Sequence, residues 1–312
     1  TQAKTLFPYT TLFRSSKAIL HPNMDLTNMQ TVHTIQAVRD FVKQAKLQGK
    51  SVGFVPTMGN LHSGHIHLIN QAKAQCDVVI CSIFVNPTQF GANEDFGSYP
   101  RTLEADSQQL KIAACDLLFA PSAFDMYPNG QNQHTVVTVN GLSEQLCGEF
   151  RPTHFAGVAT VVSKLFNIVQ PHTAFFGEKD FQQLAVIRCL TAELAFDINI
   201  VGVPTQRADD GLALSSRNGY LSEQERALAP SIYKVLCQLR TAILNGQREY
   251  TMLCDASSLH LQKMGFDPDY VAIRRASDLQ AATADDTDLV ILIAAKLGKT
   301  RLIDNIAFNL SA

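Results

Sequence analysis

Apolar residues follow two alternating patterns from residue 34 to residue 203. Short continuous apolar runs, which predict strands buried on both faces, occupy residues 52–55, 78–85, 116–120, 174–176 and 199–203. The stretches between them repeat apolar positions at helical spacing, over residues 34–47, 61–74, 102–114, 158–169 and 181–194. Buried strands that alternate with helices are typical of a parallel sheet covered by helices. We therefore predict an α/β fold with a Rossmann-like parallel sheet.

The pattern changes after Pro204. Residues 222–244 predict one long helix, with Ser222 as its N-cap and Gly246 just beyond its end. A short helix and three strands are predicted to follow, over residues 257–264, 270–274, 289–295 and 301–303. These elements indicate a second, smaller α+β domain. We therefore divide the chain into a Rossmann-like domain over residues 29–204 and a smaller C-terminal domain over residues 205–312.

The first 28 residues show no amphipathic period and join no later pattern. They also lack the continuous apolar core and small-residue cleavage site of a signal peptide. We interpret them as a non-native or disordered extension, with the native start at Met29 or, alternatively, at Met24. An ordered N-terminal arm is the other interpretation.

Composition narrows the class of protein. The chain is 46% hydrophobic and 17% charged, which is typical of a globular protein with a sizeable core. A formal net charge of −2 gives no electrostatic reason to expect nucleic acid or an anionic membrane as a partner. No stretch approaches the roughly 18 apolar residues that a membrane helix needs. The seven cysteines form no C-x-x-C pair, so a disulfide framework is not expected and we predict a cytoplasmic protein.

Residues 56–65 read P-T-M-G-N-L-H-S-G-H and form the most informative segment. They follow the first predicted strand and run into a helix, which in an open α/β sheet is where ligands bind. Gly59 and Gly64 let the backbone approach a phosphate, and the N–H groups of the helix favour negative charge. His62 and His65 lie three residues apart, so both imidazoles can face the same phosphates. A zinc site and a purely structural loop are the alternatives, although the sequence places no third zinc ligand by motif.

Two further segments place polar side chains at predicted strand ends. F-V-N-P-T-Q-F carries Asn86 and Gln89, and an amide that both donates and accepts suits a substrate with hydroxyl and carboxylate groups. F-G-E-K-D places Lys179 near a helix N-terminus, with Gln183 one turn further on. A lysine there adds positive charge for phosphate oxygens. An Asn-Pro turn and a surface Lys-Asp pair are the plain structural interpretations.

The segment D-G-L-A-L-S-S-R-N ends in two hydroxyls and Arg217, which suit a flexible phosphate clamp; a polar surface loop is the alternative. This segment resembles the "KMSKS" loop of the nucleotidyltransferase superfamily, and H-S-G-H resembles the "HIGH" signature that partners it. Together, the four segments are similar in order and spacing to those of the pantothenate synthetases, or pantoate–β-alanine ligases, and the resemblance covers residues 29–312. It implies an enzyme, an ATP-dependent ligase that condenses (R)-pantoate with β-alanine through a pantoyl-adenylate and releases AMP and pyrophosphate.

The resemblance also implies the residues of the site. The implied catalytic residues are His62, His65, Lys179 and Arg217. The implied ATP-binding residues are Met58, Gly59, Asn60, Leu61, His62, Ser63, Gly64, His65, Gly177, Glu178, Lys179, Asp180, Gln206, Leu214, Ser215, Ser216 and Arg217. Gln89 and Gln183 would bind pantoate, and Gln89 would also contact β-alanine. Second-rank candidates are Asn86, Tyr99 and Arg151.

Further expectations follow from the same resemblance. ATP is expected to act as a substrate together with Mg²⁺, whose ligands on the protein the sequence does not identify. A homodimer is the expected assembly. Two other functions stay open at this point. A cofactor-type nucleotidyltransferase would keep the nucleotide on its product, and a nucleotide-binding regulator would not turn it over. The presence of His65, Lys179 and Arg217 together argues against the regulator.

Three positions depart from the usual pattern of the family. Cys147 stands where the family usually has Glu, which weakens any role for a carboxylate beside Arg151. Thr153 replaces a glycine, and because threonine lacks the freedom of glycine at positive φ, we expect it to stiffen or redirect its loop. Thr88 replaces the commoner methionine.

Overall fold

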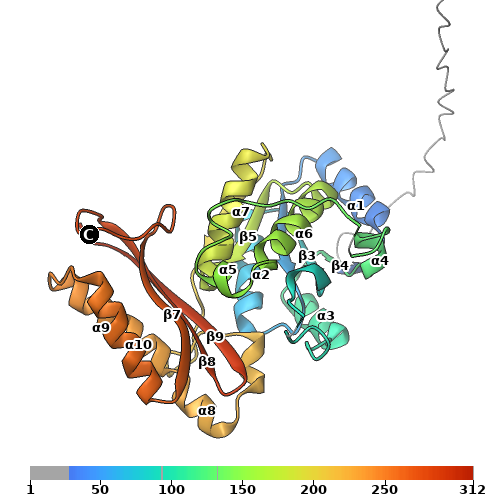
Figure 1. Cartoon of the computed structure of the whole chain (residues 1–312). Coiled ribbons are helices and arrows are strands. Elements are labelled where there is room, and N and C mark those ends of the chain that lie inside the picture. Colours follow the sequence, from blue (N-terminus) through green and yellow to red (C-terminus); the bar gives the residue numbers. More distant parts are fainter. Residues whose placement is uncertain (1–27, 93, 132, 312) are drawn as a thin grey trace, which may run out of the picture.

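The computed structural model describes residues 28–92, 94–131 and 133–311 (Figure 1). The predicted extension over residues 1–28 therefore lies outside the described residues, apart from Asn28. Within the described part, each helix is too short or too polar to span a bilayer.

The first part of the chain alternates strands and helices as predicted, and the α/β fold is confirmed. Its strands are β1 (Gln30–Val32), β2 (Val52–Thr57), β3 (Val78–Ile83), β4 (Leu117–Phe119), β5 (Thr173–Gly177) and β6 (Asn199–Val203). Its longer helices are α1 (Ile35–Leu47), α2 (Ser63–Gln75), α3 (Leu103–Ile112), α6 (His154–Val169) and α7 (Phe181–Glu193). The short elements, which the sequence did not predict, are η1 (Pro87–Gln89), α4 (Ala123–Met126), α5 (Cys147–Phe150), η2 (Glu178–Asp180) and η3 (Ser216–Tyr220), and the strand β1 was not predicted either.

The six strands form one parallel sheet in the order β1-β4-β3-β2-β5-β6. From β2 the chain builds outward through β3 and β4, and it then returns to add β5 and β6 on the other side. The direction of building therefore reverses between β2 and β5, which pair through Gly53 with Thr173 and Phe54 with Ala174. In open α/β sheets, ligands bind at the carboxyl ends of the strands beside such a reversal. This topology places the segments after β2 and β5 next to each other.

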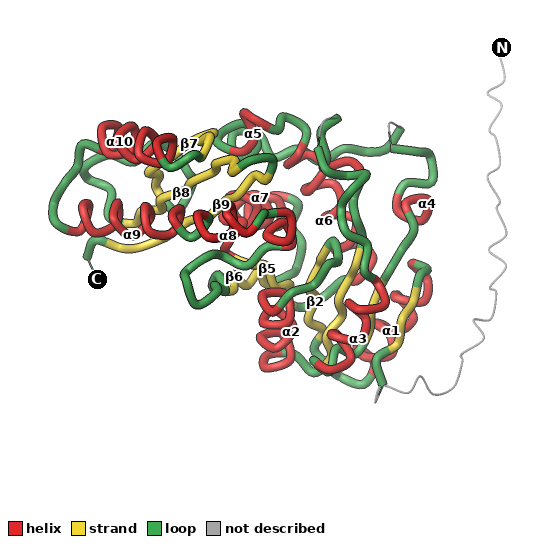
Figure 2. The backbone as a smooth tube through the Cα atoms, turned by 90° about the horizontal axis from the view of Figure 1, so that it is seen from below, coloured by secondary structure: helices red, strands yellow, loops and turns green. Residues whose placement is uncertain are grey.

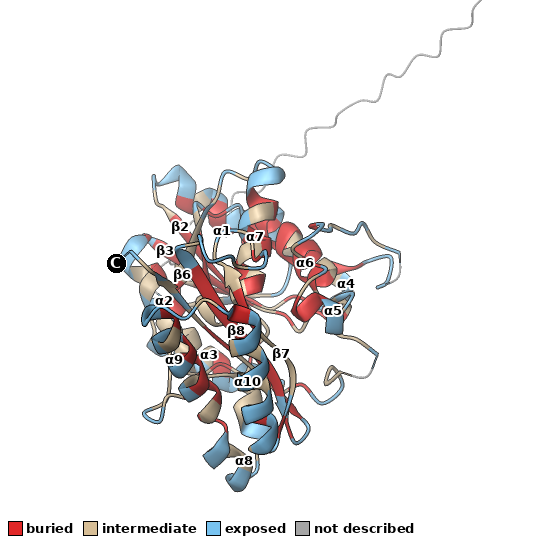
Figure 3. Cartoon of the chain, turned by 60° about the vertical axis from the view of Figure 1, so that its left-hand side comes forward, coloured by how far each residue is buried: buried red, intermediate tan, exposed pale blue. Residues whose placement is uncertain are grey.

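Alternate residues of each strand face opposite sides of the sheet, and both sides are covered. Phe54 and Ile80 belong to one buried cluster, together with side chains from α1, α6 and α7. Val55 and Cys81 belong to another, together with side chains from α2 and α3. Apolar residues at successive positions are thus all buried, which explains why the strands read as continuous apolar runs (Figure 3).

The smaller domain contains the antiparallel strands β7 (Phe266–Arg275), β8 (Asp288–Leu297) and β9 (Thr300–Asn309), in that order across the sheet. The helices α9 (Ser231–Leu244) and α10 (Tyr250–Lys263) cover one face (Figure 2). On the other face, Leu292 packs with Leu146 and Phe181 of the larger domain. β6 ends immediately before Pro204, but the proposed domain boundary stays a prediction.

Several elements of the smaller domain differ from the prediction. The single helix over residues 222–244 is wrong, because α8 (Glu223–Leu228) and α9 are separate helices with Pro230 between them. Proline has no N–H to donate and its ring interferes with the preceding turn, so it starts α9 instead of continuing α8. Ser222 is the predicted N-cap and forms a capping box with Glu225. The predicted short helix and three strands all exist but are longer than the apolar runs indicated.

Candidate active site

A cleft of about 960 Å³ opens at the carboxyl edge of the six-stranded sheet. The segments that follow β2, β3, β5 and β6 line it, because parallel strands bring their carboxyl ends to one edge. The smaller domain adds residues from the hairpin β8–β9, including Lys299 and Arg301. The cleft therefore lies between the two sheets.

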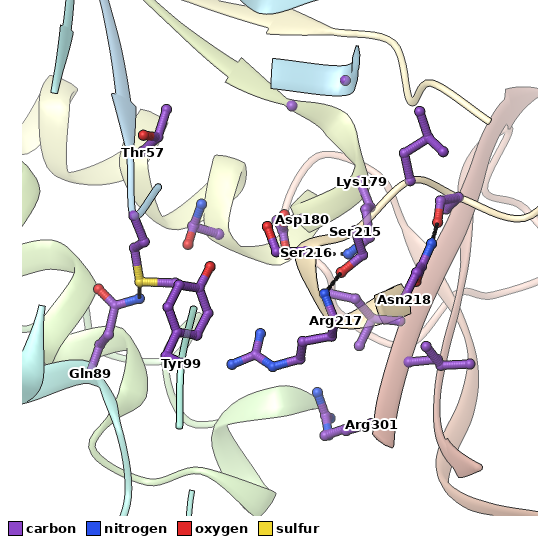
Figure 4. Close-up of a pocket in the computed structure, with 18 of the residues that line it drawn as sticks. Thr57, Gln89, Tyr99, Lys179, Asp180, Ser215, Ser216, Arg217, Asn218 and Arg301 are labelled. Carbon is purple, nitrogen blue, oxygen red and sulfur yellow. Dashed lines mark hydrogen bonds and ion pairs between the residues drawn. The ribbon is translucent and has the colours of Figure 1, made fainter. Parts of the chain in front are cut away.

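Most of the predicted site residues line this cleft. They are Met58, His62, Gly64, His65, Asn86, Gln89, Tyr99, Arg151, Gly177, Lys179, Asp180, Gln183, Gln206, Leu214, Ser215, Ser216 and Arg217. Figure 4 shows Gln89 and Tyr99 on one side of the view, with Lys179, Ser215 and Arg217 on the other. The predicted residues that do not contribute to the lining are Gly59, Asn60, Leu61, Ser63 and Glu178.

The turn after β2 is fixed by a carboxylate that the sequence did not reveal. Asp106 of α3 is 1% exposed and accepts hydrogen bonds from the backbone N–H groups of Asn60 and Leu61, at 2.9 and 2.8 Å. Gly59 has a φ of +85°, which favours glycine there. The hydroxyl of Ser216 donates to the Asn60 carbonyl at 3.0 Å. These predicted ATP-binding residues thus support the turn and the Ser216 loop behind the cleft surface.

His62 and His65 cap the start of α2 reciprocally. Nδ1 of His62 accepts from the Gly64 N–H at 3.2 Å, and Nδ1 of His65 accepts from the His62 N–H at 3.3 Å. The two rings are 4.1 Å apart between centroids. A Cβ at position 64 would lie 2.9 Å from the His62 ring, so Gly64 leaves the room that this ring occupies. Because both Nδ1 atoms accept, each neutral ring carries its proton on Nε2, which leaves two N–H donors available.

Both imidazoles are neutral near pH 7. Burial lowers the pKa of His62 to about 4, and the Lys179 ammonium lowers it further, against an opposing effect of Asp180. Burial, together with His62 and Lys179, lowers the pKa of His65 to about 3. The two histidines of the cleft therefore offer hydrogen-bond donors but no positive charge, and the positive charges at the cleft come from other residues.

Lys179 lies in η2, between β5 and α7, so it is at the strand end across the reversal point from the histidines. Its side chain is 17% exposed, and Nζ lies 3.9 Å from Oδ1 of Asp180. That long contact is weak for an ion pair, so the ammonium retains the capacity to bind another anion. The effect of Lys179 on the pKa of both histidines shows that the three side chains share one electrostatic environment.

Arg217 is held by a residue that sequence reasoning missed. Its Nε and Nη2 donate to the two carboxylate oxygens of Asp95 at 3.0 and 2.9 Å, and its guanidinium lies 5.7 Å from the Tyr99 ring centroid. Burial alone would lower the pKa of Arg217, but the Asp95 carboxylate outweighs burial and raises it. Arg217 is therefore a permanent cation at the cleft wall. Asp95 lies in a loop with no motif of its own, so only the folded structure reveals the pair.

A buried amide network orients Gln89. Asn86 donates from Nδ2 to Oε1 of Gln89 at 3.0 Å, which turns the Gln89 Nε2 toward the sulfur of Met58 at 3.1 Å. Asn86 itself accepts from the hydroxyls of Tyr127 at 2.8 Å and Thr88 at 3.1 Å. Thr88, the departure from the family pattern, therefore adds a donor to this network. The network fixes the orientation of the Gln89 amide at the cleft wall.

The backbone of Gln89 is held from two sides. Nδ1 of His154 lies 3.0 Å from the Gln89 carbonyl oxygen, which requires the proton on Nδ1. A Cβ at position 157 would lie 2.6 Å from the Gln89 backbone, so Gly157 permits the close approach of α6 to η1. Gln183, the other predicted pantoate residue, lines the cleft from α7.

The burial of His154 should make the free energy of unfolding depend on pH. Burial, aided by Arg151, lowers its pKa to about 3, whereas the unfolded chain takes up this proton near the ordinary value of 6.5. Its contribution to stability is complete above about pH 6.5 and is lost as the pH falls toward 3, by at most about 1.4 kcal/mol per pH unit. The free energy of unfolding of wild type should fall as the pH is lowered from about 7 to about 5. We expect this fall to be smaller in His154→Gln, by up to about 1.4 kcal/mol per pH unit. Urea unfolding of wild type and of His154→Gln at several pH values measures the difference. An equal dependence of the free energy of unfolding on pH in the two proteins would contradict the lowered pKa of His154.

The three departures from the family pattern are accommodated. Arg151 pairs with Glu94 at 2.6 Å, so a carboxylate lies beside it even though position 147 is cysteine. Cys147 instead contacts the smaller domain, with Sγ 3.0 Å from the Tyr270 hydroxyl. Thr153 has a φ of −98°, which any residue adopts, so threonine fits here without backbone strain, and its expected effect on the stiffness or path of the loop stays a prediction.

Across the described ranges, no group of three or more His, Cys, Asp or Glu side chains is arranged to hold a metal ion. The His62–His65 pair in particular uses both Nδ1 atoms as acceptors for backbone N–H groups. The pair therefore caps the start of α2 through its Nδ1 atoms, and its two Nε2–H groups remain as hydrogen-bond donors.

A parallel sheet with a reversal point, a glycine–histidine helix start and cations from two later loops define an α/β protein whose cleft suits a phosphate-bearing ligand. Comparison with known proteins gives the family. The profile described as Pantoate-beta-alanine ligase matches residues 30–307. The chain belongs to the pantoate–β-alanine ligase family.

Individual relatives agree. A pantothenate synthetase of Pseudomonas fluorescens (strain Pf0-1) is 58% identical over 282 residues, covering 90% of this chain and 99% of the relative. One from Alcanivorax borkumensis is 58% identical over 279 residues, covering 89% and 98%. Among solved structures, a pantothenate synthetase from Thermus thermophilus has a TM-score of 0.83 and 44% identity, covering 89% of this chain and 99% of that one. The ligase from Francisella tularensis, complexed with β-γ ATP and β-alanine, has a TM-score of 0.75 and 35% identity, covering 91% and 98%.

Proposed function

We propose that this chain joins pantoate to β-alanine at the expense of ATP, through a pantoyl-adenylate, and releases AMP and pyrophosphate. The observation that carries the proposal is the meeting of His62, His65 and Lys179 beside the reversal point of the sheet, in the same cleft as Gln89. A phosphate-binding region and an amide-lined region are thus adjacent. The family to which the chain belongs, and the ATP and β-alanine complex of the Francisella relative, support the same reaction.

In the first step, an oxygen of the pantoate carboxylate attacks the α-phosphorus of ATP. A bond forms between that oxygen and phosphorus, and the bond to the β-phosphate oxygen breaks, so pyrophosphate leaves with added negative charge. Lys179 and Arg217 stabilise this charge as cations, and His62 and His65 stabilise it as neutral Nε2–H donors. The backbone N–H groups at the start of α2 favour the same charge.

In the second step, the deprotonated amine of β-alanine attacks the acyl carbon of the adenylate. A carbon–nitrogen bond forms, the bond to the AMP oxygen breaks, and AMP leaves. Gln89 and Gln183, which both line the cleft, are proposed to hold pantoate, and Gln89 is also proposed to contact β-alanine. Their contribution is positioning, which is a large effect when two substrates must meet. The fixed amide of Gln89 supports this role, because a donor of known orientation loses little freedom on binding.

The loop from Leu214 to Arg217 is proposed to close over ATP and exclude water from the adenylate. Gln206 is proposed to contact the nucleotide through its backbone. The N–H of Leu214 donates to the Gln206 carbonyl at 2.9 Å, so the loop and Gln206 would move together. Opening of the Arg217–Asp95 pair would release the guanidinium toward the phosphates.

Mg²⁺ is proposed to enter with ATP as part of the substrate. The described residues offer no cluster of three or more side-chain ligands, and Mg²⁺ commonly keeps its waters and binds nucleotide phosphates. Its role there would be to offset phosphate charge. The same proposal includes a homodimer. It also includes a cytoplasmic location, with which the seven free cysteines are compatible.

One assay tests the reaction. With ATP and Mg²⁺, we expect AMP only when pantoate and β-alanine are both present. Exchange of labelled pyrophosphate into ATP is expected with pantoate alone, because adenylate formation precedes the amine. Nucleotide that stays on the product would instead support a cofactor-type nucleotidyltransferase, and no turnover would contradict both.

A further inference from the structure

Asn305 of β9 fixes the turn that carries Lys179. Its Nδ2 donates to the backbone carbonyls of Glu178 and Lys179, at 2.9 Å each, and the residue is 7% exposed. The turn η2 has no side-chain cap at its own N-terminus. One amide from the smaller domain therefore supplies side-chain support to a catalytic segment of the larger domain.

Asn305 is itself held in a buried charged cluster. Asp304 is 5% exposed, and it accepts the Asn305 N–H at 2.8 Å and both Nη atoms of Arg207 at 2.6 and 2.9 Å. Arg207 also donates to the Asn305 carbonyl at 3.4 Å, and its guanidinium lies 3.7 Å from the Tyr233 ring centroid. A bidentate, stacked arginine has little freedom to shift, so it gives Asn305 a defined position.

The same arginine reaches the second phosphate-facing loop. Its Nη1 donates to the carbonyl of Gly211 at 3.1 Å, and its backbone forms an antiparallel bridge with Ala213. Leu214 follows directly, and the clamp that ends at Arg217 begins there. Gly211 has a φ of +93°, and a Cβ there would lie 2.7 Å from Tyr233, so the loop passes close to the cluster.

We propose that Arg207, Asp304 and Asn305 form a positioning cluster. The cluster fixes the positions of Lys179 and of the 214–217 loop relative to each other, so that both can contact the nucleotide phosphates. This inference rests on the proposed function, because it assigns Lys179 to those phosphates. The cluster does not touch the nucleotide and acts through Lys179 and the loop. Its consequence is that movement of the smaller domain changes the position of both phosphate-facing groups together.

The test is a double-mutant cycle on ATP binding by the full chain. We expect Asn305→Ala to raise the Kd for MgATP, measured calorimetrically, by about tenfold, since small misplacements of a binding group have large effects. In a Lys179→Ala background, Asn305→Ala is expected to raise the Kd for MgATP by less than about twofold, because the ammonium that Asn305 positions is no longer present. The KM for pantoate is expected to stay within about twofold of wild type.

Controls separate the possible failures. Arg275→Gln breaks ion pairs with Asp278 and Asp286 in the same domain, and it should leave the Kd for ATP unchanged. An equal effect of Asn305→Ala in both backgrounds would overturn the inference, whereas wild-type protein that does not bind ATP would overturn the proposed function. If Asn305→Ala does not fold, Arg207→Lys carries the test. It keeps the charge beside Asp304 but loses the fork to Gly211 and Asn305, so an unchanged Kd would overturn the inference equally.

Discussion

Replacing Lys179 by alanine is expected to slow pantoate-dependent formation of pyrophosphate by about 10²- to 10³-fold, while the fold stays intact. The side chain is 17% exposed, and its one ion pair among the described residues is the long contact with Asp180, which is 46% exposed, so its loss leaves no buried partner charge behind. In the proposed reaction, its ammonium would face a leaving group whose negative charge increases as the α-phosphorus bond breaks. An interaction that strengthens toward the transition state lowers kcat and kcat/KM together.

Exchange of labelled pyrophosphate into ATP measures this step without β-alanine. Lys299→Ala is the matched control, because Lys299 also lines the cleft and is exposed, yet lies in the β8–β9 turn. We expect a change of less than about threefold for that variant, since an exposed charge is screened by solvent. Equal losses for both lysines would point to the net charge of the cleft and would contradict a specific role.

A second readout of Lys179→Ala does not depend on catalysis. Lys179 lowers the pKa of His62 and of His65, so its removal should raise both values toward 6.5. Titration of the imidazole resonances by NMR measures this shift. An active-site rate effect without any change in these pKa values would mean that the lysine lies further from the histidines than the structure shows.

The parallel sheet and most of its helices could be predicted from the sequence, because their signals are local. A strand buried on both faces reads as a continuous apolar run, and the strand with Phe54 and Val55 has that form. The carboxyl edge then follows from topology, and it places His62 and Lys179 on adjacent strand ends. The error at Pro230 had a local cause as well, since apolar spacing on both sides concealed the helix boundary.

The partners of the site residues could not be predicted, because each comes from a distant segment without a motif. Asp106 holds the turn at Asn60 across 46 positions of sequence, and Asp95 holds Arg217 across 122. Asn305 reaches Lys179 across 126 positions. Such carboxylates and amides have no periodic signature, and their role depends on tertiary packing. The sequence thus allowed us to predict which residues line the cleft, but not the contacts that orient their side chains.

Two substitutions at position 65 separate the two functions of the imidazole there. Asparagine can replace the Nδ1 acceptor that caps the His62 N–H, but it lacks a donor at the Nε2 position. Glutamine places an amide N–H near Nε2 but loses the cap. We therefore expect His65→Asn to keep wild-type stability and to lower pyrophosphate exchange by about 10²- to 10³-fold.

His65→Gln should show the opposite balance. Loss of the capping contact is expected to cost about 0.5–2 kcal/mol of unfolding free energy, while a larger share of the exchange rate survives than in His65→Asn. Thermal unfolding and pyrophosphate exchange, measured on both variants, give the two quantities independently. Because burial lowers the pKa of His65 to about 3, the missing element in the asparagine variant is a neutral donor and not a charge. Equal rates for the two variants would show that the Nε2–H does not face the reacting phosphates, and the assignment of His65 would then be reduced to the cap of α2.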